Sequence, residues 1–178
     1  MFRIITKLAG ISVIALTFLL SGAPANTASA DDPAFLTIAA GAWDFNKRDD
    51  QGAEFRLEYR SDHKLWELKP FGAVAASNTG SFFIGAGVLM DIYFGRRWVV
   101  TPSFAPHYYS QGSSDKDLGH ELEFRSQLEI AYRFDDRSRV GLSISHYSNA
   151  SIGDKNPGTE SLMLNYSIPT TTITNWLD

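Results

Sequence analysis

Three side chains that together can hydrolyse an ester occur close together near the end of the chain. His146 and Ser148 are two residues apart, and Glu160 follows Ser148 by twelve residues. A serine hydroxyl becomes an effective nucleophile when a histidine accepts its proton, and a carboxylate bonded to the other ring nitrogen fixes the histidine tautomer. A serine that caps a turn and a histidine at a polar rim would give the same pattern, so the spacing alone leaves both interpretations open.

The segments on either side of these residues have the alternation of β-strands, in which side chains two apart point the same way. His146 and Ser148 continue an apolar face of one segment, and Glu160 begins an apolar face of the next. The residues between the two segments are rich in turn formers such as Asn, Asp, Pro and Gly. We expect a hairpin in which residue 148 lies opposite 160 and residue 146 opposite 162, which puts all three side chains on one face.

Alternation with a period of two recurs along the rest of the chain. In residues 121–134, apolar or aromatic side chains on one face alternate mainly with charged ones on the other. A helix would spread these charges around its circumference, so the pattern indicates a strand. Pro102 and Pro106 remove two hydrogen-bond donors from a further strand. The sequence predicts eight strands, at residues 35–45, 53–60, 65–77, 81–94, 98–108, 121–134, 140–148 and 160–168.

Eight antiparallel strands in a chain of this length predict an all-β fold, an up-and-down β-barrel. A soluble lipid-binding barrel would turn the apolar faces inward, whereas an outer-membrane barrel would turn them toward lipid. The strands are as long as the tilted bilayer crossing of about 9–11 residues. Their polar faces carry opposite charges that could pair, such as Glu123 and Arg125, and aromatic residues gather near strand ends. We therefore predict an eight-stranded antiparallel up-and-down transmembrane β-barrel.

The start of the chain has the features of an export signal. Residues 1–30 contain a basic start, an apolar run and the cleavage site Ala28-Ser29-Ala30, which predicts a cleavable signal peptide. Residues 31–178 are then a single β-barrel domain, in which the tail 170–178 after Pro169 is either a short amphipathic appendage or disordered. The chain has no cysteine, which excludes a thiol nucleophile and a disulfide framework. Its net charge of −4 and lack of a basic block argue against a nucleic-acid partner.

The segment 145–162, SHYSNASIGDKNPGTESL, resembles the active-site hairpin of the outer-membrane lipid A 3-O-deacylases, the PagL family. It keeps a His-x-Ser-Asn core, an Asn-Pro-Gly loop and a glutamate twelve residues after the serine. The resemblance implies an outer-membrane barrel with a triad facing the outer leaflet, which removes the ester-linked acyl chain at position 3 of lipid A. By motif position, Ser148 matches the nucleophile, His146 the base and Glu160 the acid that orients the histidine.

The same resemblance implies further site residues in the loop. Asn156 and backbone N–H groups near Ser151 match the family's oxyanion-stabilising groups. Because lipid A carries phosphates, we expect a cation nearby, and Lys155 is the candidate in this loop. We expect no metal and no other cofactor; the expected partners are lipid A (lipopolysaccharide) and outer-membrane lipids, and a homodimer is left open. Two alternatives remain: a non-enzymatic structural or adhesive barrel of the outer membrane, and a soluble periplasmic lipid-binding barrel.

Overall fold

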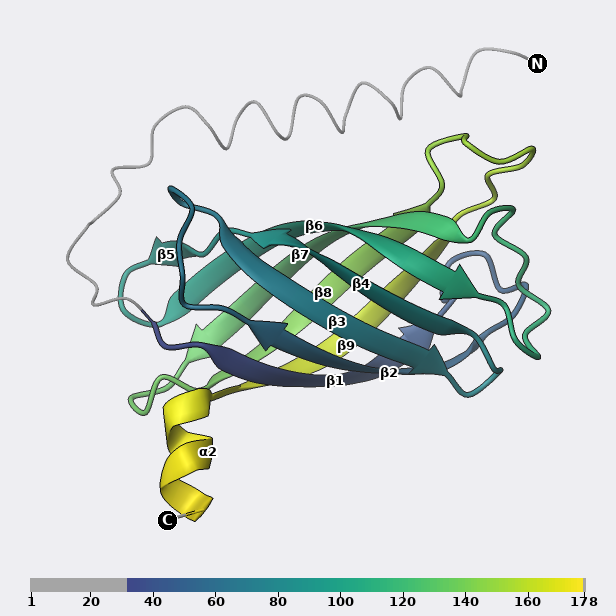
Figure 1. Ribbon diagram of the computed structural model, residues 1–178. Helices are drawn as coiled ribbons and strands as arrows, with labels where there is room; N and C mark the ends of the chain where they lie inside the picture. Colours follow the sequence, from purple (N-terminus) through teal and green to yellow (C-terminus); the bar gives the residue numbers. More distant parts are fainter. Residues whose placement is uncertain (1–31, 178) are drawn as a thin grey trace.

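Strands rich in alternating polar and apolar side chains close on themselves into one antiparallel barrel (Figure 1). The computed structural model describes residues 32–177. The predicted signal peptide, residues 1–30, lies outside this range and stays a prediction. The elements are β1 (Phe35–Trp43), β2 (Gly52–Arg60), β3 (Lys69–Ser77), β4 (Phe82–Leu89), β5 (Ile92–Phe94), β6 (Trp98–Ser110), β7 (Leu122–Arg133), β8 (Arg139–Ser148), β9 (Thr159–Pro169) and α2 (Thr170–Leu177).

The strand order closes the sheet, because β1 pairs with both β2 and β9, and β6 pairs with β4 as well as β7. β4 and β5 both pair with β6 in a single register, so they are two pieces of one strand. The break falls where Met90 meets Pro102, whose nitrogen has no hydrogen to donate; only the bond from Met90 N to Pro102 O, 3.1 Å, remains there. The prediction of an eight-stranded antiparallel up-and-down barrel is confirmed.

The two faces of the barrel wall differ in polarity. Apolar side chains such as Leu142, Ile144 and Leu164 are exposed on the outside. The inside holds buried charges: Arg60 pairs with Glu129 at 2.6 Å, and other ion pairs join facing strands in the same way. This arrangement suits a barrel solvated by lipid and is the reverse of a soluble lipid-binding barrel, so that alternative is wrong.

The charge pairs inside the barrel join strands distant in sequence. Arg125 pairs with Glu58 at 2.7 Å, not with Glu123, the neighbour along its own strand. Both carboxylate oxygens of Glu123 are without a hydrogen-bond partner among the described residues. Pairing inside the barrel is therefore set by which strands face each other across it.

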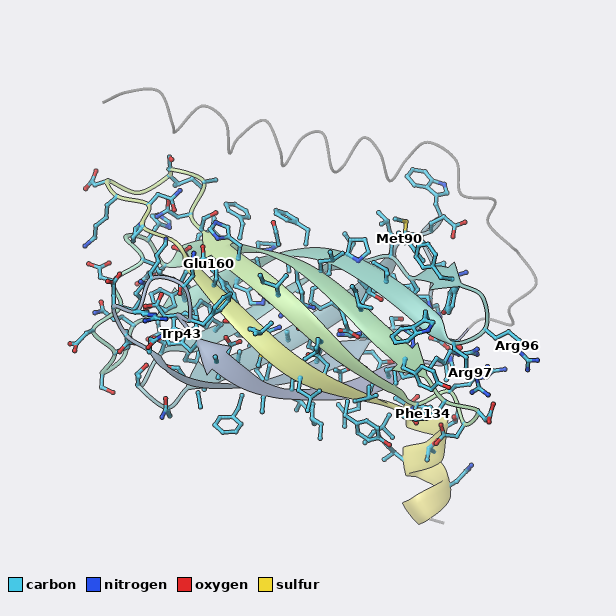
Figure 2. All side chains as sticks on the ribbon, turned by 180° about the vertical axis from the view of Figure 1, so that it is seen from behind. Trp43, Met90, Arg96, Arg97, Phe134 and Glu160 are labelled. Atoms are coloured by element: carbon cyan, nitrogen blue, oxygen red, sulfur yellow. The ribbon has the colours of Figure 1, made fainter. Side chains whose placement is uncertain are left out.

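The two ends of the barrel are unlike. One end, the loop end, carries the connections 44–51, 78–81, 111–121 and 149–158; the other, the turn end, carries 61–68, 95–97 and 134–138 together with the start of β1 and the end of β9. Bacterial barrels have their longer loops outside the cell and their short turns in the periplasm. Figure 2 shows Glu160 and Trp43 at the loop end, opposite Arg96, Arg97 and Phe134 at the turn end.

The tail after Pro169 forms α2, which resolves the open question between an ordered appendage and disorder for residues 170–177. Thr170 N donates to Ala34 O at 2.8 Å, which joins the start of the helix to the segment before β1. Among residues 32–177, no helix has the length and apolar character needed to cross a membrane.

Candidate active site

His146 and Glu160 meet directly across the hairpin formed by β8 and β9. They occupy opposite positions in the register, and His146 Nδ1 lies 3.0 Å from Glu160 Oε1. The imidazole is 49% exposed on the outer face, while the Glu160 side chain is only 17% exposed. The carboxylate thus holds one ring nitrogen and leaves the other, Nε2, free to exchange a proton with a substrate or a nucleophile.

The predicted register of this hairpin is wrong by two residues. Residue 160 lies opposite 146, not 148, and the strand pairing ends at Tyr147 and Thr159. The pairing of β8 with β9 ends earlier than predicted because Gly158 has a positive φ of 61°, which turns the backbone before β9 begins. An even shift keeps every side chain on its predicted face, so Glu160 still lies beside His146.

Ser148 lies two residues after His146 on the same outer face of β8 and is half-buried. On its other side it is paired with Phe124 of β7, whose ring stacks on Phe104 with 5.9 Å between the centroids. Tyr147, between the two site residues, points inward and is fully buried, with its ring 4.5 Å from that of Phe83. This inward anchor fixes the end of β8 while His146 and Ser148 face outward.

Asn149 organises the loop that follows Ser148. Its buried side-chain Nδ2 donates to Leu118 O at 2.9 Å and to Lys155 O at 2.8 Å. Its backbone N–H donates to Asn156 Oδ1 at 3.0 Å, which leaves the Asn156 Nδ2 hydrogens as the donors of that side chain. The sequence analysis gave Asn149 no role of its own; its place directly after the candidate nucleophile was the available signal.

The two other predicted loop residues already have partners within the protein. The Ser151 N–H donates to Asn149 Oδ1 at 2.9 Å, so in this conformation it is occupied. Lys155 Nζ lies 2.6 Å from Asp117 Oδ2, and both side chains are about half exposed. This hydrogen bond from Lys155 holds the pKa of Asp117 below its usual range. The structure therefore gives the cation of Lys155 a protein partner in the loop 111–121.

Lys47 is a second cation at the site, and the sequence analysis missed it. Its Nζ donates to Gly158 O at 2.9 Å, from the loop 44–51. A Cβ on Gly158 would lie 3.4 Å from Lys47 Nζ and 3.1 Å from His146 Cε1, so the ammonium and the imidazole border the same glycine. Lys47 is distant in sequence from the hairpin and no local pattern marks it; only the pairing of β1 with β9 brings its loop to His146.

Two ion pairs, of which the one with Asp44 is buried, hold the loop 44–51 against the loop 111–121. Lys116 Nζ lies 2.8 Å from Asp44 Oδ1 and 2.9 Å from Asp49 Oδ2, and Asp44 also accepts a hydrogen bond from Thr159 Oγ1. Burial raises the pKa of Asp44, but hydrogen bonds from Lys116, the Asp50 N–H and Thr159 outweigh it, so the pKa lies below its usual value. The cluster joins both loops to the first residue of β9, next to Glu160.

Metal-binding groups are not gathered here. Within the part of the chain that the structure covers, no group of three or more His, Asp and Glu side chains is placed to hold a metal ion.

The family model described as lipid A 3-O-deacylase (PagL) matches residues 35–169, which is the whole barrel. The chain belongs to the PagL family. Lipid A deacylase PagL of Bordetella bronchiseptica is 30% identical over 74 residues, covering 41% of this chain and 42% of that protein. Lipid A deacylase PagL of Pseudomonas aeruginosa is 38% identical over 55 residues, covering 31% of this chain and 32% of that protein.

A solved structure supports the same fold. The crystal structure of the outer-membrane enzyme PagL superposes with a TM-score of 0.60 at 20% identity, covering 76% of this chain and 99% of that one. This likeness shows that the two chains share the closed barrel. The matches to the curated PagL proteins span less than half of their length.

Proposed function

We propose that this PagL-family member is an outer-membrane serine esterase that hydrolyses the ester-linked acyl chain at position 3 of lipid A. The observation that carries the proposal is the 3.0 Å contact between His146 and Glu160 on the outer face, two residues from Ser148 on the same face. The family model supports the substrate, because its description names lipid A 3-O-deacylation.

In the proposed reaction, Ser148 Oγ attacks the carbonyl carbon of the ester while His146 Nε2 takes the hydroxyl proton. Glu160, bonded to Nδ1, holds the ring orientation and stabilises the imidazolium. The tetrahedral intermediate collapses as the sugar oxygen leaves with the proton from His146, which leaves the acyl chain on Ser148. Water then attacks this ester with His146 as base, and the fatty acid departs.

The developing oxyanion needs donors near the Ser148 hydroxyl. Asn156 fits this role, because its Oδ1 is held by the Asn149 N–H and its Nδ2 therefore remains as a donor. The Ser151 N–H could take part only after it leaves Asn149 Oδ1, to which it donates in this conformation. We therefore assign the main oxyanion contact to the Asn156 side chain. The Ser151 N–H adds a second contact only in a conformation in which it no longer donates to Asn149.

A lipid substrate explains why the triad lies outside the barrel. The outer face below His146 is apolar, with Leu142, Ile144 and Leu162 exposed toward the lipid phase. Acyl chains of lipid A can lie along this surface while the ester reaches the loop end, so the substrate need not leave the leaflet. The site is then reached by lateral diffusion in the membrane.

Recognition of a lipid A phosphate requires a cation near the triad. Lys47 borders Gly158 together with His146 Cε1, and within residues 32–177 its ammonium bonds only to the neutral carbonyl of Gly158. Lys155, by contrast, is paired with the carboxylate of Asp117. An ammonium without a carboxylate partner is more available to an anion. We therefore assign phosphate recognition to Lys47. Lys155 instead supports the loop through its ion pair with Asp117.

The function is tested by product analysis. Purified full-length protein in detergent is incubated with hexa-acylated lipid A, and the lipid is examined by tandem mass spectrometry. We expect the loss of one ester-linked 3-hydroxy fatty acid, with fragments that place the free hydroxyl at position 3. Unchanged lipid A would overturn the proposal and leave a non-enzymatic barrel as the alternative. Loss of a chain from another position would overturn the assignment to position 3.

A further inference from the structure

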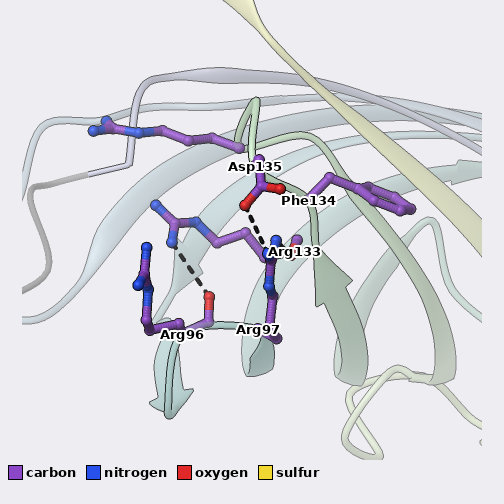
Figure 3. A pocket seen from close by; sticks show the side chains of 6 residues that line it. Arg96, Arg97, Arg133, Phe134 and Asp135 are labelled. Carbon is purple, nitrogen blue, oxygen red and sulfur yellow. Dashed lines mark hydrogen bonds and ion pairs between the residues drawn. The ribbon is translucent and has the colours of Figure 1, made fainter.

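Arginines gather at the turn end of the barrel, opposite the candidate active site. Arg96 and Arg97 lie in the turn between β5 and β6, Arg133 ends β7, and Arg137 lies in the turn between β7 and β8. Together with Phe134 and Asp135 these four arginines line a cavity of about 220 Å³ (Figure 3). A pocket lined by four guanidinium groups and one carboxylate is strongly cationic.

The ion pairs found at this cavity do not use up the charge of Arg96. Arg97 pairs with Asp135 at 2.7 Å, and Arg133 pairs with Asp32 at 2.7 Å. Asp32 also binds Arg139, so its charge is shared. No ion pair of Arg96 is found within residues 32–177, and Figure 2 shows this side chain projecting outward from the turn end. The cavity therefore keeps the positive charge of Arg96, which an anionic ligand can neutralise.

Aromatic side chains beside the pocket place it at the membrane interface. Trp98 is 53% exposed and Phe134 41% exposed, and the Arg97 guanidinium lies 5.9 Å from the centre of the Tyr132 ring. Aromatic girdles of membrane barrels lie at the depth of the lipid headgroups. Since the turn end faces the periplasm, the arginines lie at headgroup depth of the inner leaflet.

We propose that this pocket binds the phosphate group of an anionic phospholipid of the inner leaflet. Guanidinium groups form paired hydrogen bonds to phosphate oxygens, and four around one small cavity can surround a single phosphate. Basic pockets at the membrane interface bind lipid headgroups of this kind. The exposed rings of Trp98 and Phe134 offer an apolar surface for the acyl chains, which favours a lipid over free phosphate.

The proposal is tested by native mass spectrometry of the full-length protein in a phosphate-free maltoside detergent, titrated with phosphatidylglycerol. The variant Arg96→Ala leaves the Arg97–Asp135 and Arg133–Asp32 pairs in place. We expect its apparent Kd for the lipid to rise about tenfold or more, since charge-assisted hydrogen bonds are lost. Lys64→Ala, at another turn of the same end, is the matched control and should bind like the wild type.

A second variant should change the affinity for phosphatidylglycerol in the opposite direction. Asp135→Asn removes the carboxylate that pairs with Arg97 and should tighten phosphatidylglycerol binding, by about threefold. Equal binding by the wild type and Arg96→Ala, or weaker binding by Asp135→Asn, would overturn the proposal. A parallel arm adds inorganic phosphate at the lipid's own concentration; complete displacement of the lipid would assign the pocket to free phosphate and also overturn it.

Discussion

At the scale of single residues, the candidate site depends on side chains that reach it from two different strands and two loops. The sequence predicted His146, Ser148 and Glu160 on one face, and the contact of 3.0 Å between His146 and Glu160 confirms that two of them meet. The roles of all three in catalysis stay predictions. Lys47 could not be predicted, because its contact with Gly158 O depends on how the loop 44–51 folds over the hairpin.

Lys47→Met tests the assignment of phosphate recognition. The substitution keeps the length of the side chain and removes its charge, so we expect KM for lipid A to rise about tenfold with a smaller change in kcat. The difference should disappear with lipid A from which the phosphates have been removed, and Lys47→Arg should restore KM. Lys155→Met, whose ammonium pairs with Asp117, is the control; a larger KM effect there than at Lys47 would reverse the assignment.

Gly158→Ala tests how closely the loop must fit His146. An added Cβ would lie 2.9 Å from Tyr147 O and 3.1 Å from His146 Cε1, at a residue whose φ is 61°. The imidazole must then shift, and displacements of about 1 Å can lower turnover by about 10². Gly95→Ala is the matched control. Its φ of 67° gives a similar backbone strain, but nothing lies within 4 Å of the added Cβ. Equal kcat/KM losses in both variants would show that strain alone, not the contact with His146, is responsible.

At the scale of the elements, alternation predicted all eight strands, but local sequence could not predict where each hairpin turns. The register of β8 and β9 differs by two residues from the prediction because Gly158 and the Asn149 side chain turn the loop earlier. Since the shift is even, the outward face was predicted correctly. The ion pairs of Asp44 with Lys116 were beyond prediction, as the two residues lie on loops joined only by the closed barrel.

The ion pairs and hydrogen bonds around Asp44 and Lys116 should make the stability of the loops 44–51 and 111–121 depend on pH. The pKa of Asp44 lies below its ordinary value of 3.8 in the folded protein, so the unfolded chain binds the proton more readily. The stabilisation is thus present above about pH 4 and is lost as the pH falls through the lower folded pKa. We expect protection of the loop 111–121 from proteolysis to be constant near neutral pH and to fall in acid.

The variant Asp44→Asn tests how much of this pH dependence comes from the Asp44 carboxylate. The variant should show weaker loop protection at neutral pH and a flatter decline in acid than the wild type, because it has no carboxylate at residue 44 to protonate. Asp62→Asn, an exposed aspartate at the turn end, should behave as the wild type does. An acid profile of Asp44→Asn that falls as steeply as that of the wild type would contradict the role of this ion pair.

At the scale of the whole molecule, charged residues fill the inside of the barrel and an apolar surface covers its outside. The sequence predicted that charges on the polar faces could pair, but not which ones. Arg125 pairs with Glu58 and Arg60 with Glu129, across the barrel interior. These partners depend on the order and tilt of strands around the closed sheet, which no single stretch of sequence contains.

The buried pairs should respond very differently to single and double substitution. Arg60→Met leaves the buried Glu129 without its partner, which should lower the free energy of unfolding by about 3–5 kcal/mol. Arg60→Met/Glu129→Met removes both charges and should recover most of this loss. Urea unfolding in detergent, followed by the gel shift between folded and unfolded barrel, measures both. A double variant no more stable than Arg60→Met would argue against the pair as the source of the loss.

The deacylation rate of Ser148→Ala measures whether an outward-facing triad performs the ester hydrolysis. The matched control is Ser143→Ala on the same strand, because Ser143 is buried inside the barrel and bonds to Asn165. The initial rate of fatty-acid release from lipid A is measured for both variants and the wild type. We expect a loss of about 10³-fold or more for Ser148→Ala and a rate close to that of the wild type for Ser143→Ala. A Ser148→Ala rate equal to that of the wild type would contradict this expectation.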